Sequence, residues 1–371
     1  MADILDYIRW RGDLSFKKVP FCELDALVLS LLSYMELDGI ADGEKPSRAK
    51  TFSEVTALYF EKYGDKVPPR GLLMPDEFPE FFRLAAGSER YGNMRIFAYK
   101  SVYSEESETQ FAAVSMILPD GSMFISYRGT DDTLAGWKEN FNQSHIEVIG
   151  AQYHALEYFT SVSRTYRGKI RIGGHSKGGN LSMYAAINAP WRVARRIEKV
   201  YNFDGPGFAS SPSGMAGYAG VKDRIITVLP EFSVVGLLLE NGKIDQVVKS
   251  NAHNLWQHDP FSWEVEPYGF ALANRLSEEC LHVERTVKHW LSGLDGGERK
   301  GFFDAIFKVL SSNGAKTLSD ISDNKMEFVR SLAKVEPSVR NVIISTGKLL
   351  LMEGINTVHE SRKRKKTEDK G

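Results

Sequence analysis

The chain has 371 residues, of which 42% are hydrophobic and 26% are charged, and its 47 basic and 48 acidic side chains give a net charge of -1. This composition is typical of a globular protein with room for one large α/β domain or two domains. The near-zero charge argues against a nucleic-acid-binding protein, which needs a basic excess to displace counterions. The two cysteines, Cys22 and Cys280, lie far apart in the sequence. They cannot form a disulfide framework or a thiolate zinc site, and we expect a reducing compartment.

Neither a membrane span nor a secretory leader is predicted. The longest apolar runs, such as residues 111–118, have the length of a strand. Residues 1–13 carry acids and arginines where a signal peptide has its apolar core, so we expect a cytoplasmic location. The charge is uneven, because residues 281–371 hold 17 Lys or Arg and 12 Asp or Glu, which leaves a net -6 for the preceding residues. A peripheral membrane contact is therefore expected only from the C-terminal portion.

The predicted elements change in character along the chain. Residues 1–90 have a helical and irregular pattern, with an apolar cluster at 27–35 and a proline-containing connection at 67–75. From residue 93, short β-rich runs alternate with loops and helical patterns. A Pro-Asp-Gly turn at 119–121 joins two of the runs into a predicted hairpin. The predicted strands are residues 94–99, 110–118, 123–127, 169–173, 199–203, 224–229 and 246–250.

Apolar residues at helical spacing predict a helix over residues 149–162 and another over 180–188. Strands separated by helices predict a mainly parallel central sheet covered by helices on both faces, which is an α/β fold. From about residue 276 only helical periodicity remains, in stretches near 276–292, 299–312, 326–334 and 337–360. A basic tail follows at 362–366 and is expected to be disordered.

One motif predicts chemistry. The strand 169–173 leads into G-H-S-K-G at residues 174–178, a G-x-S-x-G pattern followed by a helix. The glycines permit a sharp strand-to-helix turn that projects the hydroxyl of Ser176, and the turn places the backbone N–H of Lys177 at a helix N-terminus. Such an N–H can stabilise the oxyanion of a tetrahedral intermediate. The alternative is a glycine-rich turn with an incidental serine.

A serine nucleophile requires a histidine base and a carboxylate, which in this fold follow the serine in the order acid, then histidine. His253 and His258 follow the last predicted strand, and a proline-ended turn favours His258. Asp204 ends the strand after the serine motif and is the favoured acid, with Glu231 after the next strand as the alternative. Asp204 could equally cap the turn that follows it.

A second oxyanion donor is expected from an earlier strand-to-helix loop. Residues 126–132 close the predicted strand 123–127, and Thr130 can offer its backbone N–H and its hydroxyl. Thr130 is also a candidate N-cap for a helix through Trp137, and the two roles are compatible.

Taken together, Y-R-G-T at 127–130, Trp137, Asn140 and the serine motif resemble the paired signature of the class 3, fungal-type lipases, which are α/β-hydrolases. F-D-G-P-G at 203–207 and Q-H-D-P-F-S-W at 257–263 look more specifically like a bacterial family of uncharacterised lipase-like proteins. The resemblance covers about residues 90–270. It implies Ser176 as nucleophile, His258 as base, and Thr130 with Lys177 as the oxyanion hole.

The sequence departs from class 3 lipases at the acid and beside the nucleophile. Their aspartate follows the strand that here ends near Leu229, and Ser233 rather than Glu231 is expected to match that position. Lys177 replaces a residue that is usually apolar. Its cation would either favour an anionic substrate or point to solvent.

These features predict an N-terminal portion at 1–90, an α/β-hydrolase core at 91–275, a helical extension or lid at 276–360 and a tail at 361–371. The expected function is hydrolysis of a carboxylic ester or thioester through an acyl-enzyme on Ser176. The expected substrate is a small acyl ester or a lipid. No cofactor and no metal are expected. The alternative is a noncatalytic interaction module that contacts a partner or a membrane surface through its C-terminal portion.

Overall fold

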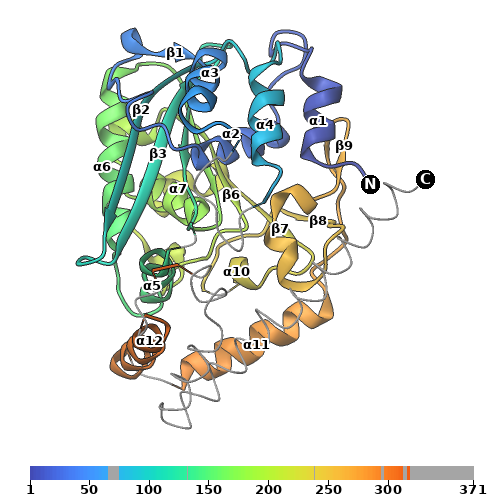
Figure 1. Ribbon diagram of the computed structural model, residues 1–371. Helices are drawn as coiled ribbons and strands as arrows, with labels where there is room; N and C mark the ends of the chain where they lie inside the picture. Colours follow the sequence, from blue (N-terminus) through green and yellow to red (C-terminus); the bar gives the residue numbers. More distant parts are fainter. Residues whose placement is uncertain (66–74, 132, 238, 294–295, 312–315, 318–371) are drawn as a thin grey trace.

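The computed structural model describes residues 1–65, 75–131, 133–237, 239–293, 296–311 and 316–317 (Figure 1). Its centre is an eight-stranded sheet in which the strands lie in chain order. Pairing is antiparallel from β1 to β4 and parallel from β4 to β8, which confirms the predicted α/β fold with its mainly parallel sheet. The strands are β1 (Lys50–Thr51), β2 (Arg95–Ser104), β3 (Thr109–Ile117), β4 (Met123–Tyr127), β5 (Ile170–His175), β6 (Ile197–Phe203), β7 (Ile225–Pro230) and β8 (Gln246–Val248).

Two layers of helices cover the sheet, one on each face. Successive side chains of a buried strand point to opposite faces, so both faces need an apolar cover. In β3, Ala112 and Val114 belong to one hydrophobic cluster while Phe111 and Ala113 belong to the other. The first cluster is closed by α1 (Ile4–Arg11), α2 (Glu23–Leu31), α3 (Phe52–Tyr63) and α4 (Phe78–Ala86). The second is closed by α6 (Gly150–Thr165) and α7 (Lys177–Ile187), on the opposite face in Figure 1.

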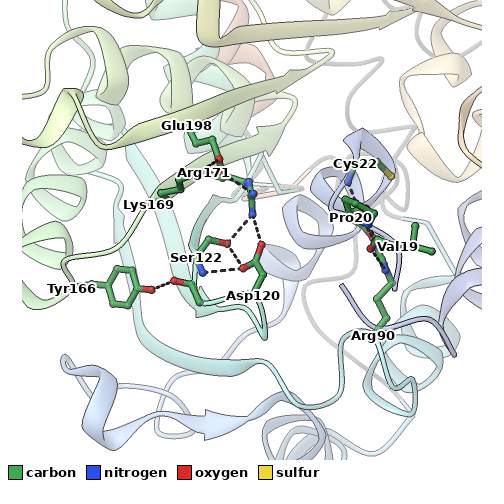
Figure 2. A network of polar contacts seen from close by, with 12 residues as sticks. Val19, Pro20, Cys22, Arg90, Asp120, Ser122, Tyr166, Lys169, Arg171 and Glu198 are labelled. Atoms are coloured by element: carbon green, nitrogen blue, oxygen red, sulfur yellow. Dashed lines mark hydrogen bonds and ion pairs between the residues drawn. The ribbon is translucent and has the colours of Figure 1, made fainter. Parts of the chain in front are cut away.

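The N-terminal residues therefore share a core with the sheet. Arg90 holds the loop between α1 and α2 in place (Figure 2). This buried arginine donates to the carbonyl oxygens of Val19 and Pro20, at 3.1 and 3.3 Å. Its guanidinium also pairs with the buried carboxylate of Asp25 in α2, at 2.6 Å. Helices α1 to α4 thus provide one of the two covering layers, and the predicted boundary at residue 90 remains a prediction.

A further group of helices, separate from the two covering layers, lies at the carboxyl ends of the parallel strands. Here lie α5 (Leu134–Asn142) and α10 (Val234–Leu237), and the C-terminal α11 (Glu278–Ser292) and α12 (Gly296–Leu310) pack against them (Figure 1). The rings of Phe141 in α5 and Phe303 in α12 lie 4.6 Å apart. Helical residues at 278–292 and 296–310 agree with two of the four predicted C-terminal stretches. The other two and the basic tail lie outside the described residues.

The remaining short elements connect the larger ones. They are η1 (Leu32–Tyr34), η2 (Pro46–Arg48), α8 (Trp191–Ala194), η3 (Pro212–Gly214), α9 (Tyr218–Val221), η4 (Lys222–Arg224), η5 (Asn254–His258), η6 (Pro260–Ser262), β9 (Val265–Glu266) and β10 (Gly269–Phe270). Within the described ranges, no helix has the length and hydropathy needed to span a membrane.

Candidate active site

Ser176 lies in the tight turn between β5 and α7, as the motif predicts. Its φ of +57° is in the left-handed region, which a residue with a side chain adopts only where the surroundings enforce it. The flanking glycines are required by close packing. A Cβ on Gly178 would lie 2.1 Å from the carbonyl oxygen of Tyr127, and one on Gly174 would lie 2.4 Å from the carbonyl carbon of Gly178. Strained turns of this kind are typical of functional sites.

His258 and Asp204 form a close pair beside this turn. Nδ1 of His258, at the end of η5, lies 2.6 Å from Oδ2 of Asp204, which directly follows β6. Asp204 is 1% exposed and its φ is +50°, so it too has a strained backbone. The carboxylate fixes the proton of the imidazole on Nδ1 and leaves Nε2 as the basic nitrogen. His258 and Ser176 line one cavity, which is described below.

The other candidates from the sequence lie elsewhere. Glu231 is half-buried after β7, where its backbone bonds to Val248 and Ser277, and the carboxylate that contacts His258 is that of Asp204. His253 is exposed at the start of η5. The geometry therefore brings together Ser176, His258 and Asp204.

Ser233 supports Asp204 from the loop after β7. Its hydroxyl donates to Oδ1 of Asp204, while the serine oxygen accepts from the backbone N–H of Gly236 at 3.1 Å. A Cβ at Gly236 would lie 2.7 Å from the same carboxylate oxygen. The backbone N–H of Ser233 donates to the sulfur of Cys280 in α11, at 3.2 Å. Thus α11 braces the loop that orients the carboxylate.

The loop after β4 brings Thr130 to the cavity. Nδ2 of Asn140 in α5 donates to Oγ1 of Thr130 at 2.7 Å, which fixes the threonine side chain. A Cβ on Gly129 would lie 3.1 Å from Cβ of Ser176, so glycine allows the close approach. The prediction that Thr130 caps the following helix is wrong. Thr133 is the N-cap of α5 and accepts from the backbone N–H of Gly136.

Both predictions for the side chain of Lys177 are wrong, because the ammonium neither reaches solvent nor lines the cavity beside Ser176. Lys177 is completely buried, and its Nζ donates to Oε2 of Glu139 at 2.9 Å and to two oxygens of Gln110 at 2.6 and 2.7 Å. A buried ammonium requires such partners, and here they tie α7 to α5 and β3. Lys177 is the first helical residue of α7, so its backbone N–H has no acceptor within the helix.

His175 is a further site residue that sequence reasoning missed. Its Nε2 lies 2.9 Å from the carbonyl oxygen of His258, and its Nδ1 lies 3.1 Å from the hydroxyl of Tyr34 in η1. The two imidazole rings are 4.7 Å apart. Burial holds the pKa of His175 well below its usual value, and the nearby His258 lowers it further. A neutral His175 therefore holds the backbone of His258 without competing for its proton.

The cavity that joins these residues has a volume of about 110 Å³. Residues of the N-terminal layer, the loop after β4 and the η5–η6 segment line it together. They are Leu31, Tyr34, Pro75, Phe78, Thr130, Asp131, Trp137, His175, Ser176, Val235, Leu255, Trp256, His258, Asp259 and Pro260.

This fold, with a serine at the strand-to-helix turn, is of the lipase-like α/β class. The chain belongs to the Mbeg1-like family, whose model matches residues 85–308. The family confirms the predicted lipase-like resemblance and points to a hydrolase, whereas the class 3 and bacterial relationships remain predictions.

A solved structure described as the crystal structure of M37 lipase is similar over 58% of this chain and 70% of its own, with 13% identity and a TM-score of 0.37. No curated protein matches the sequence.

Proposed function

We propose that the protein is a serine hydrolase that cleaves a carboxylic ester or thioester through an acyl-enzyme on Ser176. The observation that carries the proposal is the 2.6 Å contact between His258 and Asp204 at a cavity that Ser176 also lines. A carboxylate on the far side of an imidazole is needed to hold its tautomer and to stabilise the imidazolium that forms during acyl transfer.

In the proposed mechanism Oγ of Ser176 attacks the acyl carbon while Nε2 of His258 accepts the hydroxyl proton. The backbone N–H groups of Thr130 and Lys177 stabilise the oxyanion, since Thr130 lines the cavity beside the serine and Lys177 is the first residue of α7. The imidazolium then protonates the departing alcohol or thiol. Water, deprotonated by His258, releases the acid and restores Ser176.

The alternative, a noncatalytic interaction module, has less support. A module without catalysis would not need a buried carboxylate on the histidine, nor strained backbone at both Ser176 and Asp204. The segments proposed to contact a partner or membrane include the basic tail, outside the described residues. That contact and the cytoplasmic location remain predictions.

The test compares wild type with Ser176→Ala on a panel of p-nitrophenyl esters and thioesters of increasing acyl length. We expect hydrolysis to fall by at least about 10³-fold, to the background of the variant preparation. Labelling with a fluorophosphonate should likewise require Ser176. Ser213→Ala, at an exposed position on η3, is the matched control and should retain both activities. Equal turnover by wild type and Ser176→Ala would overturn the proposal.

A further inference from the structure

The cavity beside Ser176 has an aromatic wall assembled from four separate elements. Tyr34 comes from η1, Phe78 from α4, Trp137 from α5 and Trp256 from η5. The rings of Tyr34 and Phe78 lie 5.3 Å apart. The faces of aromatic rings carry negative electrostatic potential and attract cations, above all quaternary ammonium groups.

The charged residues of the lining are acidic. Asp131 and Asp259 line the cavity, and no lysine or arginine is among the described residues that do so. Asp131 has a partner behind the wall, since the 4% exposed guanidinium of Arg128 lies 3.7 Å from its Oδ2. The negative charge of Asp131 is therefore largely offset within the protein.

Asp259 differs because no lysine or arginine in the described part of the chain forms an ion pair with it. Its Oδ1 accepts from the backbone N–H of Phe261 at 2.9 Å, and the charged groups that act on it are Glu77, Asp3 and His258. Burial raises the pKa of Asp259 to about 7; Glu77 and Asp3 also raise it, while the Phe261 hydrogen bond and His258 lower it. A carboxylate surrounded by protein is costly without a cation, and this one opens onto a cavity shared with the nucleophile.

We propose that the cavity binds the cationic group of a small carboxylic ester, a quaternary ammonium such as that of an acylcholine, with Asp259 as its counterion and the aromatic rings around it. This inference names the substrate class and so rests on the proposed function. The cavity volume of about 110 Å³ suits a compact group, since a cavity of about 150 Å³ holds one benzene molecule. Ser176 and Asp259 line the same cavity, so one small ester can reach both.

The first experiment compares two esters that differ only in charge, butyrylcholine and 3,3-dimethylbutyl butyrate, in which carbon replaces the charged nitrogen. We expect kcat/KM to favour the cationic ester by about 10-fold or more, the range of one desolvated cation–π contact with a counterion. Asp259→Asn should lower this ratio by about 10-fold. Glu266→Gln, which removes the same charge from an exposed position in β9, should leave the ratio unchanged. Hydrolysis of both esters at equal kcat/KM by wild type would overturn the inference and leave the proposed function standing.

The second experiment measures binding without turnover. Ser176→Ala protein is titrated with phenyltrimethylammonium and with the neutral tert-butylbenzene, and the fluorescence of the tryptophans is followed. Saturable binding of the cation alone, weakened about 10-fold by a further Asp259→Asn change, is expected. If neither ester is hydrolysed but the cation binds in this way, the proposed function fails and the cation site stands. Binding that is absent, or unchanged by Asp259→Asn, would overturn the site.

A further variant guards against misfolding of Asp259→Asn. Trp256→Leu removes one aromatic face and keeps Asp259, and it should lower the ratio of the two kcat/KM values by about 3- to 10-fold. An unchanged ratio in folded Trp256→Leu would contradict the aromatic contribution.

Discussion

Polar residues at the two ends of the parallel strands differ in their contacts and in their backbone conformation. At the amino ends, Figure 2 shows Arg171 of β5 between Asp120 and Glu198, which it contacts at 3.0 and 2.6 Å. Asp120 also accepts from the backbone and hydroxyl of Ser122, at 2.8 and 2.5 Å. Every one of these groups finds its partner in a neighbouring strand or turn, and the residues have ordinary backbone conformations.

At the carboxyl ends, Ser176 and Asp204 have positive φ, and the hydroxyl of Ser176 opens onto a cavity. Strained conformations persist only where the surrounding structure holds them, and they cluster where chemistry requires an exact orientation. Ligands of open α/β sheets bind at the carboxyl ends of the strands. The comparison therefore predicts that changes at the carboxyl ends alter catalysis with little effect on stability. Changes at the amino ends should lower stability and leave catalysis unchanged.

After Ser176→Ala, Asp204→Asn should have the largest effect on catalysis among the changes considered at the carboxyl end. The amide keeps the size of the carboxylate but cannot stabilise an imidazolium, and it favours the wrong tautomer of His258. We expect kcat to fall by roughly 10²- to 10⁴-fold. The measurement is kcat on an ester that wild type hydrolyses, with thermal unfolding recorded in parallel.

Glu231→Gln, the change at the alternative acid, is the matched comparison for Asp204→Asn. It should retain most of the activity. A large loss in Glu231→Gln with normal activity in Asp204→Asn would reverse the assignment of the acid.

Ser233→Ala should have a smaller effect, because it removes only the hydroxyl that donates to Asp204. A carboxylate that loses this donor is less well oriented, so it holds the imidazole of His258 less firmly. We expect kcat/KM at neutral pH to fall by about 10-fold, which corresponds to the loss of one hydrogen bond to a charged group.

Ser233→Thr keeps the hydroxyl and should restore most of the rate. A purely structural role of Ser233 would lower the melting temperature and leave kcat/KM of the folded Ser233→Ala protein at the wild-type value.

The sequence predicted the strands of the sheet well because each is a short apolar run between turn residues, and seven of the eight appear close to their expected ranges. The eighth, β1, has two residues and no pattern of its own. The strand-to-helix turn at Ser176 was predictable because the glycines and the serine are adjacent in the chain.

Long-range contacts were harder to predict. Asp204 was preferred over Glu231 from the restraint of its turn, but its contact with His258 spans 54 positions. The role of Ser233 and the buried ion pair of Lys177 depend on which loops meet in space. So does the use of residues 1–90, which contribute Tyr34 and Phe78 to the cavity. These contacts follow from the packing of separate elements, and local pattern carries no information about them.

The smallest effect is expected at the opposite end, from Arg171→Met. Its guanidinium is 13% exposed and its partners are 26% and 28% exposed, so solvent screens the ion pairs in part. We expect a loss of about 1–2 kcal/mol in the free energy of unfolding, and unchanged kcat/KM. Lys169→Met is the matched control, because Lys169 pairs with the same Glu198 but is 73% exposed and should contribute at most a few tenths of a kcal/mol.

The stabilising effect of Arg171 should also depend on pH. Burial alone would raise the pKa of Asp120, but the hydrogen bonds from Ser122 and the ion pair with Arg171 outweigh it and lower the pKa. A carboxylate with a lowered folded-state pKa stabilises the protein above its unfolded value of about 3.9, and this contribution is lost as the pH falls through the folded value. The difference in stability between wild type and Arg171→Met should therefore be constant near neutral pH and shrink below about pH 4. Urea denaturation at several pH values measures it. A difference that persisted undiminished in acid would show that Arg171 stabilises this end through its packing on Phe21, 4.4 Å from the guanidinium, rather than through charge.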